Sequence, residues 1–76
     1  MRDRELAYEI ILTPDEDTWM VTVPDLPGCL TYGHSKDEAK AMAKEAIEGV
    51  LASMRDRGIP IPEPSHVEIA TVRVSA

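Results

Sequence analysis

The sequence SKDEAKAMAKEAIEGVLASMRDR, residues 35–57, predicts one long amphipathic helix. Its apolar residues recur every three or four positions and define a single buried face: Ala39, Met42, Ala43, Ala46, Ile47, Val50, Leu51 and Met54. Ser35 and Glu38 have the spacing of a capping box, in which each side chain accepts a hydrogen bond from a backbone N–H at the helix start. Gly58 and Pro60 predict where the helix ends. The remaining sequence is short and strand-like, so we expect a sheet built against this helix.

The length of 76 residues predicts one domain, spanning residues 1–76. One helix covers only one face of a sheet, so the other face must be polar or contact a partner, and we expect a homo-oligomer. The formal net charge of −6 argues against unaided binding to nucleic-acid phosphates or anionic membranes. It suits a basic partner protein, although acidic surfaces also serve solubility alone.

The single cysteine excludes a disulfide within the chain and fits a reducing compartment. No apolar run approaches the roughly 20 residues that span a bilayer. The charged residues 1–5 lead directly into a predicted strand, which is not the pattern of a signal peptide. These features predict a cytoplasmic protein.

Alternating apolar and polar residues predict four strands. They fall at residues 6–12, 19–23, 29–32 and 67–74. The first two form an antiparallel hairpin around a polar turn at residues 13–18, and prolines at alternate positions make residues 59–64 an extended connector. A right-handed crossover through the helix would place the last strand parallel to the first. The predicted fold is α+β, in the order β-β-β-α-β, with a four-stranded mixed sheet of order 3-2-1-4.

The second and third strands are joined by the sequence VPDLPGC, residues 23–29. Neither Pro24 nor Pro27 can donate to a strand ladder, so the second strand must end here. Pro27 and Gly28 are a typical turn pair, because proline presets φ and glycine permits a positive φ.

Combined with its flanking sequences, this stretch resembles the HicB antitoxin superfamily. The shared pattern has an aromatic residue in the second strand, VPDLPGC, a third strand followed by G-x-S, then E-A, a helix and G-x-x-I-P-x-P. These features fall on Trp19, Val23 to Cys29, Gly33, Ser35, Glu38, Ala39 and Gly58 to Pro64. The resemblance extends from about Tyr8 to the last predicted strand.

The resemblance implies a truncated RNase H-like fold and the function of a type II antitoxin. The implied partner is a HicA-type toxin, a small basic ribonuclease that degrades mRNA and whose active site the antitoxin would cover. The expected toxin-binding residues lie around the loop that contains Pro24, Pro27, Gly28 and Cys29. They are Trp19, Asp25, Leu26 and Tyr32. The alternative is that this loop is a structural turn with packed aromatic residues and contacts nothing.

Two other functions remain open at this stage. A stand-alone oligomeric binding module without a toxin would have the same sequence features. A residual RNase H-like nuclease would need metal-binding acids, for which Glu9, Asp15, Asp17 and Asp25 are the candidates, but only Glu9 lies inside a predicted strand.

Neither a catalytic residue nor a bound metal or cofactor is expected. Cys29 and His34 have no evident third group to complete a nucleophilic triad. Longer HicB proteins carry a C-terminal DNA-binding module, and since none is recognisable before Ala76, direct DNA binding is not expected. The sequence therefore predicts a non-enzymatic protein that works through contacts with other proteins.

Overall fold

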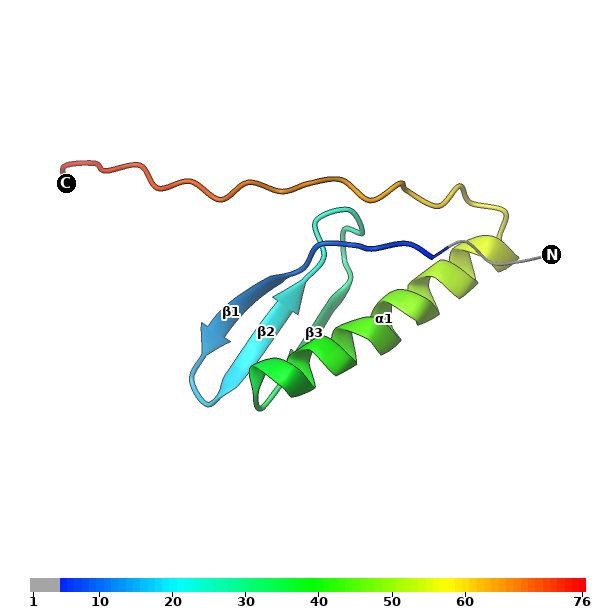
Figure 1. The fold of residues 1–76 in the computed structure, drawn as a ribbon, viewed down its shortest axis with the longest axis horizontal. Coiled ribbons are helices and arrows are strands. Elements are labelled where there is room, and N and C mark those ends of the chain that lie inside the picture. Colours follow the sequence, from blue (N-terminus) through cyan, green and yellow to red (C-terminus); the bar gives the residue numbers. More distant parts are fainter. Residues whose placement is uncertain (1–4) are drawn as a thin grey trace.

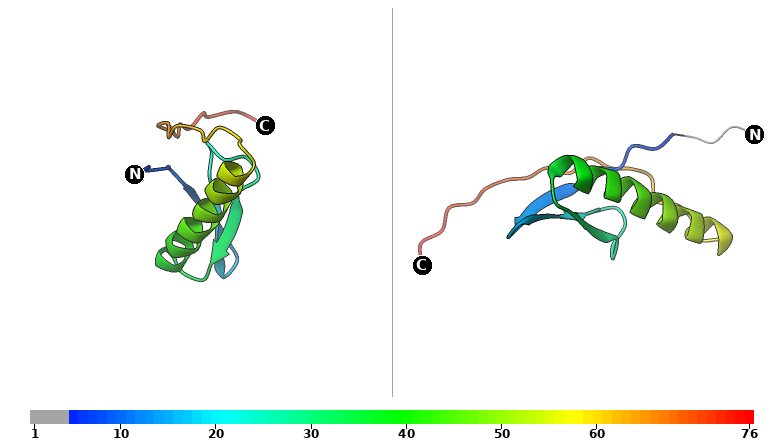
Figure 2. Two further views of the ribbon diagram at one scale, coloured as in Figure 1. Left: turned by 90° about the vertical axis from the view of Figure 1, so that its right-hand side faces the viewer. Right: turned by 90° about the horizontal axis from the view of Figure 1, so that it is seen from below.

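A computed structural model describes residues 5–76, so residues 1–4 of the predicted domain, with most of the charged N-terminal run, lie outside it. The elements are β1 (Ile11–Asp15), β2 (Thr18–Thr22), β3 (Leu30–Gly33) and α1 (Lys36–Asp56). The strands form an antiparallel sheet in the order β1-β2-β3, and α1 lies across one face of it (Figures 1 and 2). The predicted α+β class with one long helix is confirmed. No helix in the described part of the chain is long and apolar enough to cross a membrane.

The start of α1 is capped much as its sequence predicts. Ser35 is the N-cap, and its Oγ accepts a hydrogen bond from the backbone N–H of Glu38 at 3.0 Å. The Glu38 carboxylate accepts from the backbone N–H of His34, also at 3.0 Å. The return bond of the capping box thus reaches one residue further back than the pattern predicts. Both bonds satisfy N–H groups that have no partner inside the helix.

The end of α1 also follows the prediction. Gly58 has φ of 69°, the left-handed conformation that glycine adopts without strain. Its N–H donates to the Arg55 carbonyl at 3.2 Å, and the Ile59 N–H donates to the Met54 carbonyl at 2.8 Å. This pair of bonds is a Schellman motif. It turns the chain sharply out of the helix and into the proline-rich connector.

The first hairpin is displaced from its predicted position. β1 begins at Ile11 rather than at residue 6, and it continues through Pro14 to Asp15, where a turn was predicted. Asp15 pairs with Thr18, so only Glu16 and Asp17 form the turn. Glu16 accommodates this tight turn with φ of 55°. Pro14 is tolerated because β1 is an edge strand, where the missing N–H can face away from the sheet.

The connection between β2 and β3 consists of two successive turns. The Leu26 N–H donates to the Val23 carbonyl and the Cys29 N–H donates to the Leu26 carbonyl, both at 3.0 Å. Gly28 has φ of 89°, as expected at the third position of a type II turn with Pro27 before it. Val23, Leu26 and Cys29 are all buried, so each turn returns one apolar side chain to the core. β3 then starts at Leu30, one residue later than predicted.

The predicted fourth strand is not found. Residues 67–74 are extended, but in the described chain they pair with no other strand, and the sheet has three strands rather than four in the order 3-2-1-4. The truncated RNase H-like sheet, which needs that strand, is therefore not seen. The physical reason lies just before it: residues 65–67 are hydrogen-bonded to Asp25 and Glu9, and from there the chain runs away from β1 (Figure 1).

The core lies between α1 and the sheet in two neighbouring clusters. One contains Val21, Ala39 and Ala43, and the other contains Val23, Leu26, Cys29 and Leu51. Ile61 of the connector packs against the second cluster, and the Tyr8 hydroxyl donates a hydrogen bond to the Pro62 carbonyl. The connector is therefore a segment laid along the domain surface, as its apolar residues predict.

At Gly33 the sheet approaches the helix closely. A Cβ atom at this position would lie 2.3 Å from the Ala39 nitrogen and 2.6 Å from its Cα. We expect Gly33→Ala to lower the free energy of unfolding by roughly 1–3 kcal/mol, because backbone must move to admit the methyl group. Urea denaturation followed by circular dichroism would measure the change.

Gly49→Ala is the matched control. Gly49 lies inside α1, and an added Cβ would meet nothing within 4 Å. This substitution should raise the free energy of unfolding by about 0.5–1 kcal/mol, because alanine favours the helix over glycine. Similar effects at both positions would contradict the close packing of β3 on α1.

Candidate interaction surface

The sheet face that α1 does not cover carries exposed apolar side chains. Val21 is completely buried against α1, so its neighbours Met20 and Thr22 point to the opposite face. The register pairs Met20 with Tyr32 and Thr22 with Leu30, which places these two β3 residues on that face as well. Leu30 is 51% exposed and Tyr32 is 46% exposed. We call Met20, Thr22, Leu30 and Tyr32 the open sheet face.

The predicted toxin-binding residues do not share this surface. Tyr32 lies on it, whereas Trp19 is partly buried on the helix side, packed against the cluster around Val21. The Lys36 ammonium lies 4.9 Å from the centre of the Trp19 ring, a cation–π contact between the start of α1 and β2. Leu26 is only 3% exposed and belongs to the core.

The VPDLPGC loop has a clear structural role. Pro24, Pro27 and Gly28 are exposed at its surface, while Cys29 is buried at its end. Burial raises the pKa of the Cys29 thiol, because the charged thiolate would lose its hydration. Cys29 and His34 lie at opposite ends of β3, which gives no support to a Cys–His pair. Contact between this loop and a partner stays a prediction.

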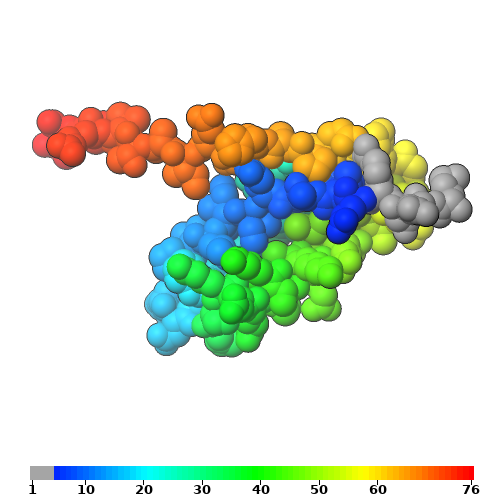
Figure 3. Space-filling view, viewed as in Figure 1, coloured from blue at the N-terminus to red at the C-terminus, as the bar shows by residue number. Residues whose placement is uncertain are grey.

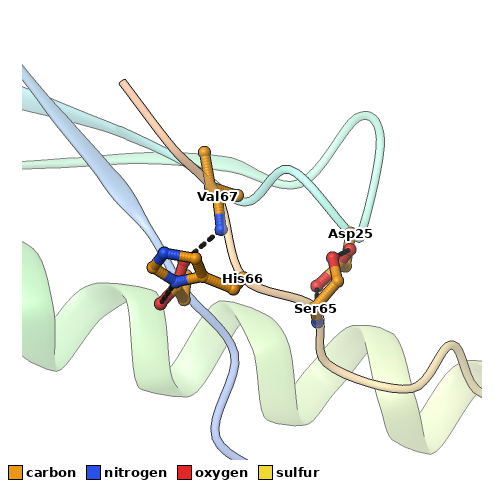
Figure 4. Close-up of polar contacts among 5 residues, drawn as sticks. Asp25, Ser65, His66 and Val67 are labelled. Carbon is orange, nitrogen blue, oxygen red and sulfur yellow. Dashed lines mark hydrogen bonds and ion pairs between the residues drawn. The ribbon is translucent and has the colours of Figure 1, made fainter. Parts of the chain in front are cut away.

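Asp25 and Glu9 bind the returning C-terminal segment, and Figure 4 shows Asp25 beside Ser65. The Asp25 carboxylate accepts hydrogen bonds from the Ser65 backbone N–H at 2.8 Å and from the Ser65 hydroxyl at 2.6 Å. The Glu9 carboxylate accepts from the Val67 N–H and lies 3.0 Å from Nδ1 of His66. We call Ser65, His66 and Val67 the C-terminal anchor. These hydrogen bonds lower the pKa of both carboxyl groups, since each stabilises the ionised form.

The acids considered for a nuclease are thus divided between two places. Glu9 and Asp25 bind the C-terminal anchor, and Asp15 and Asp17 lie at the β1–β2 turn. Within residues 5–76, no group of three or more His, Cys, Asp and Glu side chains is arranged to hold a metal ion.

Sequence reasoning missed two features of this region. Leu30 and Met20 join Tyr32 on the open sheet face, and the alternation of residues 19–23 already put Met20 opposite Trp19 and Val21. Ser65 was missed as the partner of Asp25. No short sequence signal links two residues 40 positions apart, so only the fold reveals this contact.

Comparison with known proteins gives a consistent family relationship. A family described as HicB_like antitoxin of bacterial toxin-antitoxin system matches residues 8–74. A UPF0150 protein of Thermoplasma acidophilum is 42% identical over 65 residues, covering 84% of this chain and 94% of that protein. Antitoxin HicB 2 of Photorhabdus laumondii is 34% identical over 73 residues, covering 96% of this chain but 52% of that protein.

The chain spans about half of some of its relatives. An uncharacterised 14.9 kDa protein of Haemophilus phage HP1 is 33% identical over 63 residues, covering 83% of this chain and 47% of that protein. The Photorhabdus protein is likewise covered for about half of its length, whereas the Thermoplasma protein is covered almost completely. No solved structure gives a significant match.

The C-terminal anchor should detach in acid. Because the pKa values of Glu9 and Asp25 are lowered by their bonds to the anchor, anchoring is complete above the ordinary carboxyl pKa and is lost as pH falls through the lowered values. We expect the backbone amide signals of Ser65 and Val67 to move toward those of a detached chain only when the pH falls below the ordinary carboxyl range of about 4. Two-dimensional NMR would follow this change, with the amides of α1 as an internal reference for global unfolding.

Single substitutions separate the two carboxylates. Glu9→Gln should weaken the acid transition at Val67, and Asp25→Asn should weaken it at Ser65. Glu68→Gln is the control, because this neighbouring carboxylate is exposed. An unchanged transition in both test variants would show that other groups control the anchor.

Proposed function

Because the chain belongs to the HicB-like antitoxin family, we propose that it neutralises a small basic HicA-type toxin, an mRNA-degrading ribonuclease, by binding it directly. The observation that carries this proposal is the family match over residues 8–74. The relative named Antitoxin HicB 2, which aligns with 96% of this chain, supports it. The chain acts here as a binding protein and not as an enzyme.

The charge of the chain supports a basic partner. A net charge of −6 would attract a cationic ribonuclease and disfavour RNA, the ligand for which the toxin's cationic surface is built. Glu45 and Glu48 are exposed on α1 and contribute to this field. An acidic domain bound over the toxin's cationic surface would compete with phosphate groups for the same charges.

The open sheet face is the contact surface that this proposal favours. Tyrosine is among the residues that most often dominate the binding energy of protein interfaces, and Tyr32 is exposed there beside the apolar Leu30. Trp19 and Asp25 stay in the proposal as partly exposed residues of the predicted site. Leu26, which is buried, would contribute only by fixing the VPDLPGC loop.

Three further properties belong to the same proposal. The chain forms one domain over residues 1–76 and associates with copies of itself. It acts in the cytoplasm, where a reduced Cys29 and an mRNA-degrading partner are both expected. Its acidity disfavours unaided DNA binding.

The function is tested first by capture and then by inhibition. Tagged protein is used as bait in the native cell lysate, and captured proteins are identified by intact mass. A small basic protein captured in stoichiometric amounts is purified, and its cleavage of mRNA is measured with and without an equimolar amount of this chain. We expect cleavage to be suppressed at least tenfold. Recovery of self-copies alone, or unchanged cleavage, would instead favour a stand-alone module without a toxin.

The contact surface is tested with paired alanine substitutions. Leu30→Ala and Tyr32→Ala should each weaken binding to the captured toxin by about tenfold or more, as expected for central interface residues. Met42→Ala is the control, because Met42 is 38% exposed but lies on α1 rather than on the open sheet face. Calorimetric titration would measure the dissociation constants. Loss of affinity in the Met42 variant alone would move the contact to the helix.

A further inference from the structure

The last residues of the chain form an exposed apolar arm. Residues 68–76, which we call the tail, continue from the C-terminal anchor as an extended segment (Figures 1 and 3). Ile69 is 81% exposed, Val72 is 80% exposed and Val74 is 81% exposed. No other large apolar side chain in the described part of the chain is more than 51% exposed. The tail therefore carries the most exposed large apolar side chains of the described residues.

The tail has the composition of a strand. Its β-branched residues Ile69, Thr71, Val72 and Val74 favour extended backbone, and the segment contains no proline or glycine. A segment of this kind with an unpaired backbone and exposed apolar side chains tends to pair with a free sheet edge. The tail is thus an extended segment with the composition of a strand that pairs with no strand of the described chain.

The outer side of β1 is one of the two unpaired edges of the three-stranded sheet in residues 5–76. β1 pairs with β2 along one side, and no strand within residues 5–76 pairs with its outer side. Just before β1, a groove of about 570 Å³ lies between residues 5–10 and α1. Its lining mixes apolar residues with charged ones: Leu6, Ile10, Ala43, Ile47 and Leu51 beside Glu5, Lys40, Lys44, Glu48 and Arg55.

The tail does not occupy the edge of its own domain. Glu9 lies two residues before β1 and binds the Val67 N–H, so the tail leaves the domain close to the beginning of that strand. From this point it diverges from β1 instead of following it (Figure 1). The anchor presents the tail outward, although the edge that could receive it lies next to it.

We propose that the tail of one copy adds to the β1 edge of a second copy, whose tail returns to the first. Each chain has one extended tail and one free β1 edge close to the anchor of that tail, so a two-fold exchange uses both and closes as a dimer. A second copy of the chain can pair both the tail and the β1 edge, whereas a different partner would leave one of them unpaired. This inference rests on the self-association in the proposed function and is independent of the toxin.

Exchange predicts that charges in the tail break the dimer. In reducing buffer, which excludes a disulfide through Cys29, sedimentation equilibrium of the wild-type chain should give twice its mass of 8.4 kDa. The double variant Ile69→Glu/Val72→Glu should weaken self-association at least tenfold and sediment as a monomer at micromolar concentration. Its circular dichroism should keep the helical signal of α1, because the tail is outside the core.

The control adds the same charge at the end of the same tail. Ser75→Glu/Ala76→Glu introduces two acids beyond the alternating apolar residues and should remain dimeric. If the Ile69/Val72 variant stays dimeric, tail exchange is overturned while self-association stands. If the wild-type chain is a monomer, both fail. Neither result bears on toxin inhibition, which is measured separately.

A mixed-label experiment distinguishes exchange from closure of the tail onto its own sheet. Chains labelled with ¹³C and ¹⁵N are refolded with unlabelled chains, and filtered NMR spectra select contacts between different molecules. Contacts from the methyl groups of Ile69 and Val72 to β1 of the other chain are expected. Contacts seen only within one chain would overturn the proposal, as would a wild-type tail that becomes ordered only when the captured toxin is added.

Discussion

The fold depends on the close approach of two backbones at Gly33. The last residue of β3 lies so near Ala39, in the first turn of α1, that no side chain fits between them. Small residues continue this contact, because Ala39 and Ala43 pack directly on Val21 in the middle strand. The first turns of α1 therefore pack closely on the sheet. Its later turns meet the larger residues that the β2–β3 loop supplies.

The VPDLPGC loop completes that second half of the core. The two turns return Val23, Leu26 and Cys29 inward at three-residue intervals, where they meet Leu51 of the helix. The prolines fix the backbone between these positions, and they face solvent. The VPDLPGC motif, which the sequence suggested as a recognition loop, therefore has a structural role in filling the core. This role accounts for the burial of Leu26, whereas Pro24 and Pro27 are exposed and accessible to a partner.

The helix was predictable because its signals are local. Ser35, Glu38 and Gly58 occupy cap positions within a few residues of the backbone groups that they satisfy or turn. The same is true of the Pro27–Gly28 turn. The boundaries of β1 were not predictable in this way, since Pro14 is acceptable only because the strand lies at an edge, which is a property of the whole sheet.

The contact residues were harder to predict than the fold for a related reason. Alternation along a strand tells which residues share a face but not which face the helix covers. Trp19 and Tyr32 both looked like contact residues, yet the single helix covers the side with Trp19 and leaves the side with Tyr32 open. The pattern of residues 67–74 predicted a fourth strand, but no strand is found there in the described chain. Its pairing could not follow from sequence, because Glu9 and Asp25 direct the segment from positions far away in the chain.

The proposed toxin contact and the proposed tail contact use different parts of the sheet, so they need not compete. One face is filled by α1, the other presents Leu30 and Tyr32, and the outer edge of β1 offers backbone groups rather than a side-chain surface. A strand added at β1 would enlarge the open sheet face instead of covering it, because strands extend a sheet in its own plane. Dimer formation through the tail would therefore leave the proposed toxin surface exposed. A dimer built this way could bind one toxin on each sheet, and self-association would then favour the antitoxin role rather than oppose it.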